Sequence, residues 1–279
     1  MTPDCAPAKP RPTPPRHRVP SGSCDCHFHV FGPYARFPLD AQRPYTPPEA
    51  SVEHYAETAA VLGLERRVVV TASVSGTDNA VTMDAVHRLG RAQSRAVVVV
   101  DEAADLAALA AGGAVGVRFN AVSGNGAPLD ALEALARRIA PLGWHVQVFT
   151  NSLPELADRL AALPVPVVLD HMGGAQAAEG ADGPAMRALL RLLEGGKAWV
   201  KLSGYRSAPA PYRGVAALAE RLLHAAPERC VWGTDWPHTG FKTDAEMLDD
   251  GTLLDWLHDW TGGDWQRVLV ENPARLYGF

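Results

Sequence analysis

The strongest constraint on the fold is an alternation of short apolar blocks with amphipathic segments that continues along the chain after residue 23. The blocks are rich in β-branched residues and predict strands, whereas the segments between them have helical periodicity. The predicted strands cover residues 23–29, 68–72, 96–100, 115–119, 145–149, 165–170, 198–202 and 230–234, and the predicted helices cover residues 48–64, 78–92, 103–111, 129–142, 153–163, 184–193, 215–225 and 253–260. Alternation of this kind is typical of parallel strands with helical crossovers. Eight repeats in 279 residues predict an α/β fold, a closed (β/α)8 TIM barrel, as a single domain over residues 24–279.

Two proline-rich stretches lie outside this pattern. Residues 1–23 are rich in proline and basic residues and contain no apolar core of a secretory signal. We expect them to form a flexible or surface-draped arm, to which we assign no function. Residues 32–48 carry five prolines and follow the first strand, so we expect them to lie over the barrel mouth as a lid.

Composition excludes several classes of protein. The net charge is −5, and basic residues are interspersed with acidic ones, so no basic stripe indicates nucleic-acid binding. No apolar run is long enough to span a membrane. Cys24 and Cys26 lack the spacing of a zinc or redox motif, and we expect buried, reduced thiols in a cytoplasmic protein. The sequence is compatible with a monomer or a small homo-oligomer.

Titratable residues follow several predicted strands. His27 and His29 end the first strand, His171 follows the sixth, and Asp235 follows the eighth. In a parallel barrel the carboxyl ends of the strands meet at one face, where active sites form. Residues two apart on a strand point the same way, so the His27 and His29 side chains are expected to converge with Asp235.

The residues around these positions resemble the amidohydrolase superfamily. The resemblance rests on the His-x-His of the first strand, on Leu-Asp-His-Met-Gly at 169–173, on Trp-Gly-Thr-Asp-Trp-Pro-His at 232–238 and on the closing segment 271–279. Within the superfamily it points to the branch of lactone hydrolases that includes 2-pyrone-4,6-dicarboxylate lactonase. The segments 43–47 and 116–120 also resemble that branch. The resemblance as a whole covers residues 24–279.

The resemblance implies hydrolysis of a small anionic lactone. His27, His29 and His171 are predicted to polarise the lactone carbonyl, and Asp235 is predicted to take a proton from the attacking water. The predicted substrate-binding residues are Arg118 and Arg206, which would hold a carboxylate, together with Tyr45, Ser73 and His238.

A metal is not expected to be required. The fourth strand places Arg118 where metal-dependent relatives carry a bridging ligand, and the fifth has no histidine at its carboxyl end. An arginine beside the site would repel a second cation. A single zinc ion on His27, His29, His171 and Asp235 remains a chemically reasonable alternative.

Three further points stay open in the sequence. Gly124 and Gly174 stand where the resemblance implies arginines for a dicarboxylate, so we expect a lactone with fewer anionic groups or one bound differently. A zinc-dependent decarboxylase of the same superfamily is an alternative, although it would usually add a histidine from the fifth strand. A non-catalytic ligand-binding barrel is a third hypothesis, because a fold does not by itself define a function.

Overall fold

The computed structural model describes residues 4–279 and contains one closed ring of parallel strands. The strands are β1 (Cys24–Phe28), β2 (Arg66–Val70), β3 (Ser94–Val98), β4 (Ala114–Asn120), β5 (His145–Phe149), β6 (Val167–Leu169), β7 (Ala198–Lys201) and β8 (Cys230–Val231). Each strand pairs with the next along the chain. Backbone hydrogen bonds from Cys26 N to Trp232 O (2.9 Å) and from Asp235 N to His27 O (2.7 Å) join the chain at β8 to β1. The TIM barrel predicted from the sequence is therefore confirmed.

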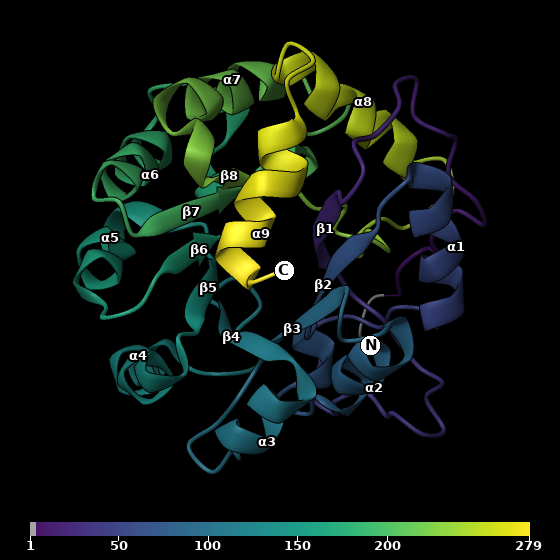
Figure 1. Cartoon of the computed structure of the whole chain (residues 1–279), viewed down its shortest axis with the longest axis vertical. Helices are drawn as coiled ribbons and strands as arrows, with labels where there is room; N and C mark the ends of the chain where they lie inside the picture. Colours follow the sequence, from purple (N-terminus) through teal and green to yellow (C-terminus); the bar gives the residue numbers. More distant parts are fainter. Residues whose placement is uncertain (1–3) are drawn as a thin grey trace.

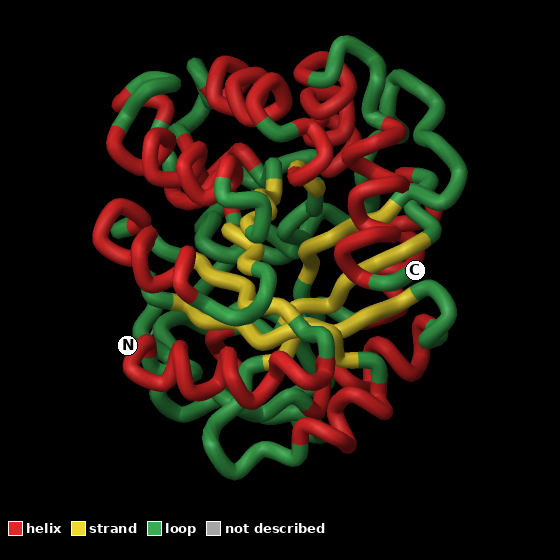
Figure 2. The backbone as a smooth tube through the Cα atoms, turned by 60° about the vertical axis from the view of Figure 1, so that its left-hand side comes forward, coloured by secondary structure: helices red, strands yellow, loops and turns green. Residues whose placement is uncertain are grey.

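Helices surround the strands on the outside of the ring (Figures 1 and 2). They are α1 (Val52–Leu62), α2 (Ala80–Leu89), α3 (Leu106–Gly112), α4 (Leu132–Ile139), α5 (Leu153–Ala162), α6 (Pro184–Glu194), α7 (Val215–Ala225), α8 (Asp250–Trp260) and α9 (Asn272–Tyr277). The first eight correspond to the predicted helices.

Helix α9 was not predicted, and it lies across the ring of strands in Figure 1. Arg95, at the beginning of β3, donates hydrogen bonds to the carbonyl oxygens of Tyr277 and Gly278. The Tyr277 side chain is buried in the same apolar cluster as Val68 and Val97 of the neighbouring strands. Helix α9 therefore closes the amino-terminal end of the barrel, opposite the end where the strands finish.

A bulge in β1 decides which way its side chains point. Asp25 pairs with Arg67 of β2 and Phe28 with Val69, so one extra residue of β1 is accommodated between these pairs. Because the regular alternation is broken here, Asp25 contacts Tyr55 of helix α1, whereas His27 faces the centre of the barrel. The bulge thereby turns an imidazole toward the barrel axis.

Asp25 ties the two ends of the ring together. Its Oδ1 accepts hydrogen bonds from the backbone N–H groups of His27 and Thr234, both at 3.0 Å. Its Oδ2 accepts from Thr234 Oγ1 (2.7 Å) and from Tyr55 OH (3.0 Å). This buried carboxylate therefore fixes the segment that carries Asp235 against the strand that carries the histidine pair.

The proline-rich arm is described from residue 4 onward and follows helix α8. Thr13 N and Oγ1 donate to the Asp249 carboxylate, and Arg16 pairs with Asp255 at 2.9 Å and Asp259 at 3.0 Å. Whether the arm is flexible stays a prediction.

Three of the four cysteines, Cys24, Cys26 and Cys230, are buried, and none of the four forms a disulfide in the described part of the chain. Among residues 4–279, no helix combines the length and the apolar character needed to cross a lipid bilayer.

Candidate active site

A cavity of about 270 Å³ opens at the carboxyl ends of the strands. The predicted site residues that line it are His29, Tyr45, Ser73, Arg118, His171, Arg206 and Asp235. His27 is fully buried close beside it, within 3.6 Å of Asp235. The predicted lid contributes Pro44 and Tyr45 to the wall, so residues from both the strands and the lid meet at this cavity.

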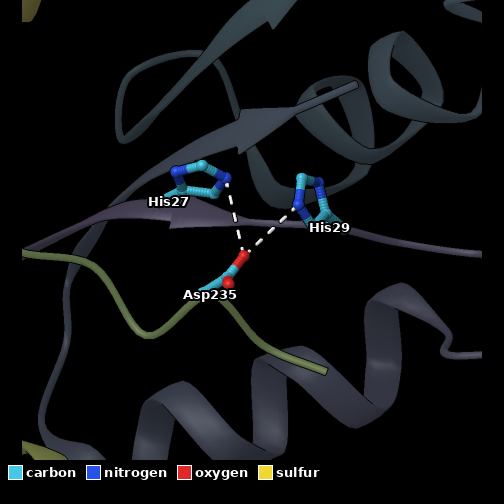
Figure 3. Close-up of side chains that lie close together, drawn as sticks. All are labelled: His27, His29 and Asp235. Atoms are coloured by element: carbon cyan, nitrogen blue, oxygen red, sulfur yellow. Dashed lines mark ion pairs between the residues drawn. The ribbon is translucent and has the colours of Figure 1, made fainter. Parts of the chain in front are cut away.

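Asp235 lies at the centre of the predicted catalytic group (Figure 3). Its Oδ1 is 3.6 Å from His27 Nε2 and 3.5 Å from His29 Nε2, and its Oδ2 is 3.8 Å from His171 Nε2. The backbone of Asp235 has a φ of +59°, in the left-handed region that non-glycine residues rarely adopt. Strained backbone of this kind is common where a side chain must be aimed into a site.

The tautomer of His29 follows from its second ring nitrogen. His29 Nδ1 lies 2.7 Å from the Val70 carbonyl oxygen, which can only accept, so Nδ1 carries the proton. The other ring nitrogen, Nε2, faces Asp235 Oδ1 at 3.5 Å. His27 Nε2 has no hydrogen-bond partner among the described residues. His27 Nδ1 lies 3.3 Å from Lys201 Nζ, a donor, and 3.2 Å from Asp170 Oδ1, an acceptor, so these contacts allow either tautomer of His27. The two Nε2 atoms therefore face the Asp235 carboxylate across a space that suits a water molecule or a cation.

The donor set fits a single metal ion. Ligand atoms bound to one tetrahedral ion at about 2.1 Å lie about 3.4 Å apart, close to the distances from Asp235 Oδ1 to the two imidazoles. His27, His29 and Asp235 form one potential metal-binding group, and His27, Asp170 and His171 form another. In the second group Asp170 is already paired with the Lys201 ammonium at 3.3 Å. The chemistry of the site thus favours one ion at most.

A buried polar network contacts the Nδ1 side of the His27 ring, inside the barrel. Asp170 Oδ1 lies 3.2 Å from His27 Nδ1 and 3.3 Å from Lys201 Nζ. Lys201 also donates to Gln147 Oε1 at 2.7 Å, and Gln147 Nε2 donates to Asp170 Oδ2 at 3.1 Å. Arg118 Nε donates to the same Oδ2 at 3.2 Å. Asp170 therefore has two cations beside it, while its Oδ1 accepts no hydrogen bond from the described residues.

The environment sets the protonation of these groups. Burial, reinforced by the Lys201 ammonium, holds the pKa of His27 well below its usual 6.5, and burial lowers the pKa of His171 to about 4. Burial opposes the charge of Asp235, but the Arg206 guanidinium and the neighbouring imidazoles overcome it and hold its pKa well below 3.8. At neutral pH the site therefore contains a carboxylate beside neutral imidazoles of His27 and His171.

Arg206 and Tyr205 hold the second oxygen of Asp235. Arg206 Nε donates to Oδ2 at 2.7 Å, and Tyr205 OH donates to the same oxygen. Arg206 also lies between the cavity and an outer groove of about 710 Å³, which it lines together with Phe149. Arg206 Nη2 also donates to the Thr239 carbonyl oxygen at 3.3 Å, so only part of its N–H groups is left for the cavity that it lines.

The remaining predicted residues differ in position. Tyr45 OH accepts a hydrogen bond from Thr239 Oγ1 at 3.4 Å, and Ser73 lines the cavity beside it. His238 is buried, and its Nε2 lies 2.8 Å from Asp250 Oδ1 at the first turn of α8. The structure does not bring His238 into the cavity wall, and its predicted contact with substrate stays a prediction.

Four contributors were not among the predicted site residues: Lys201, Asp170, Gln147 and Tyr205. Gln147 and Lys201 lie on strands, Asp170 directly follows β6, and Tyr205 lies in the short helical turn Gly204–Ser207 after β7. Gln147, Asp170 and Lys201 stand at the carboxyl ends of predicted strands, so the sequence predicts their place at this face of the barrel, but no role was assigned to them. Their pairing across the barrel could not be read from sequence separation.

A steric constraint explains why position 174 is occupied by glycine. A Cβ at Gly174 would lie 2.2 Å from the Thr150 carbonyl oxygen, and its φ is +77°. No arginine fits at this position without a shift of backbone. Gly124, by contrast, has open space around it.

Comparison with known proteins shows that the chain is similar to two hydrolases that are named for lactone substrates. The chain is 37% identical to the 4-sulfomuconolactone hydrolase of Hydrogenophaga intermedia, over 100% of this chain and 96% of that protein. It is 38% identical to the 2-pyrone-4,6-dicarboxylate hydrolase of Comamonas testosteroni, over 95% and 93% of the two chains.

Solved structures agree with these relatives. An apo crystal structure of an Agrobacterium tumefaciens protein superimposes with a TM-score of 0.87 at 32% identity, covering 97% of this chain and 99% of that one. A probable 2-pyrone-4,6-dicarboxylic acid hydrolase from Acinetobacter baumannii, crystallised with citric acid, gives a TM-score of 0.82 at 25% identity over 92% and 100%. The amidohydrolase family model matches residues 24–279. The chain is therefore a member of the amidohydrolase family.

Proposed function

We propose that the protein hydrolyses a small anionic lactone. The observation that carries the proposal is the ionised Asp235, placed among three imidazoles at the base of a cavity large enough for one ring. Full-length similarity to two lactone hydrolases supports the same reaction class.

The first step of the reaction is attack of water on the lactone carbonyl. Asp235 Oδ1 accepts a proton from that water, since this oxygen faces the open part of the site while Oδ2 is held by Arg206 and Tyr205. The proton passes to the ring oxygen as the C–O bond of the lactone breaks, which leaves a hydroxy acid or its keto tautomer.

His171 orients the carbonyl, whereas His29, with its ring proton bonded to Val70, lacks the donor for the hydrogen bond predicted for it. His171 Nε2 lies 3.8 Å from Asp235 Oδ2, and a neutral ring with its proton on Nε2 can donate to the developing oxyanion. A metal ion, when bound by His27, His29 and Asp235, would lower the pKa of a water and polarise the carbonyl. The chain's own donors and the buried carboxylate provide orientation and proton transfer in either case.

Arg118 and Arg206 bind the carboxylate of the substrate. Both guanidinium groups line the cavity, and each uses only part of its five N–H donors on Asp170 or Asp235. Tyr45 and Ser73 add hydrogen bonds from the lid side. Gly174 supports a substrate with fewer anionic groups than a dicarboxylate, because its backbone leaves no space for another arginine.

The test is a hydrolysis screen of carboxylated lactones, run with and without chelator. The panel contains muconolactones, sugar lactones and the pyrone dicarboxylate, and the product is identified by mass and by NMR. Ring-opened acid at the mass of substrate plus water supports the proposal. Loss of carbon dioxide would indicate a decarboxylase, an unchanged mass with a new spectrum would indicate a lactone isomerase, and binding without any product would indicate a non-catalytic barrel.

A further inference from the structure

The proline-rich arm reaches the mouth of the barrel and contributes to the substrate cavity. Asp4 and Cys5 are among the residues that line the cavity, together with Tyr45 of the lid. Cys5 N donates to the Thr46 carbonyl oxygen at 3.0 Å, and Ala6 N donates to that of Phe241 at 2.8 Å. The arm therefore lies between the lid and the loop after β8, where it closes one side of the cavity.

Contacts with His54 of α1 and with residues along α8 hold the arm there. The Lys9 carbonyl oxygen accepts a hydrogen bond from His54 Nε2 at 3.0 Å, and the Lys9 ammonium lies 3.5 Å from Asp249. Farther along the helix, Arg16 bonds to Asp255, and the His17 and His258 rings stack with centroids 3.6 Å apart.

The path of the arm also depends on the absence of a side chain at Gly251. A Cβ at this position would lie 2.0 Å from the Thr13 carbonyl oxygen, so the backbone of the arm passes directly over the first turn of α8. Polar, aromatic and steric contacts thus fix the arm over a length of more than ten residues, from the mouth toward the far end of α8.

The arm changes the charge of the cavity. Four cations lie in or directly below it, namely Arg118, Lys201, Arg206 and Lys242, against the carboxylates of Asp4, Asp170 and Asp235. Among these seven charged side chains, the cations exceed the carboxylates by one. Within residues 4–279, Asp4 and Lys242 form no ion pair, and both are exposed at the rim.

We infer that the N-terminal arm is a wall of the substrate site and that Asp4 selects lactones with one anionic group over lactones with two. The inference rests on the proposed function and adds to it the residue that limits the charge of the substrate. The first anionic group is neutralised by the arginines within the cavity. A second group at the rim meets the Asp4 carboxylate, which offsets the attraction of Lys242.

The first test is Asp4→Asn in the whole 279-residue chain, with Asp158→Asn on the exposed surface of α5 as the matched control. At low ionic strength, we expect Asp4→Asn to raise kcat/KM for a dianionic lactone about fivefold relative to a monoanionic one, and we expect 0.5 M salt to reduce the gain. The change should lie in KM, because Asp4 is at the rim and Asp235 holds the reacting water. The control should leave the ratio unchanged.

The second test releases the arm from a distance. Arg16→Glu opposes Asp255 and Asp259 with a like charge, and Arg137→Glu on exposed α4 is the control. Because Cys24, Cys26 and Cys230 are buried, alkylation by iodoacetamide followed by mass spectrometry reports mainly on Cys5. We expect Arg16→Glu to accelerate alkylation of Cys5, to raise KM and to relax the preference for monoanions, whereas Arg137→Glu does none of these.

The outcomes separate this inference from the proposed function. Thermal-shift titrations with the same lactones measure binding irrespective of turnover. If the wild type binds lactones in the cavity but opens none, the proposed function is wrong, and the binding ratio of Asp4→Asn still tests the arm. An unchanged charge preference in Asp4→Asn, or faster alkylation in Arg16→Glu with unchanged KM and binding, overturns the inference. A wild type that binds no lactone overturns both.

Discussion

Lys201 Nζ lies 3.3 Å from Asp170 Oδ1 in the centre of the barrel, and neither side chain has any exposed surface. Burial lowers the pKa of Lys201, and the Asp170 carboxylate opposes that shift. For Asp170, burial is overcome by Lys201, His27 and Arg118, which hold its pKa well below 3.8. The pair remains charged because each member supplies the counterion that the interior lacks.

Removing both members should cost less than the sum of the two single removals. We expect Lys201→Met to lower the free energy of unfolding by about 3 kcal/mol or more, because it weakens the neutralisation of a buried carboxylate. The double variant with Asp170→Asn should lose clearly less than the sum of the two single changes. Urea unfolding followed by circular dichroism measures all four members of the cycle, and strict additivity would contradict a direct coupling.

Asp235→Asn should abolish turnover while keeping the fold. The amide retains the size of the side chain but cannot accept the proton of water, so we expect kcat to fall at least about 100-fold. Circular dichroism and the melting temperature check the fold, and Asp158→Asn is the surface control. A variant with near wild-type kcat on its lactone would show that another group acts as the base.

Zinc should bind with a stoichiometry of no more than one ion per chain. Potential ligand atoms of His27, His29 and Asp235 lie close together, whereas Asp170 of the second group is already paired with Lys201. Titration calorimetry on chelator-treated protein measures the stoichiometry, and His29→Asn should weaken binding strongly. Two ions per chain would mean that Lys201 gives up its place beside Asp170.

The buried His145 should make stability depend on pH. Burial, with Lys201 nearby, lowers its pKa to about 3, compared with about 6.5 for an exposed imidazole. Since the unfolded chain takes up the proton first, this contribution is complete above pH 6.5 and is lost as the pH falls toward 3, with a slope of at most about 1.4 kcal/mol per pH unit. Unfolding free energies measured between pH 7 and 4 should fall less steeply in His145→Gln. An identical slope in the variant would show that His145 is solvated in the folded protein.

Much of the fold was predictable because it is encoded locally. The apolar blocks and helical segments each report a preference of consecutive residues, and the strand ends that carry His29 and Asp235 follow from the same pattern. The short helix α9 was missed because six residues at the end of a chain give too little periodicity to identify a helix.

The candidate site was predictable in residue type but not in its contacts. Arg118 was predicted to meet a substrate carboxylate, and it also donates to Asp170. Likewise, Arg206 holds Asp235 directly. Such partners lie tens of residues apart, and their distance depends on how the barrel closes rather than on any local preference.

By itself, the sequence determined the eightfold strand–helix repeat, the face at which the polar residues gather and the pairing of imidazoles with a carboxylate. Only the tertiary structure decided that a bulge turns His27 inward, that Lys201 neutralises Asp170 and that Asp4 reaches the cavity. The reason is physical. Secondary structure follows from short-range periodicity, whereas the direction of a side chain at a bulge, the partner of a buried charge and the path of an arm are set by long-range packing.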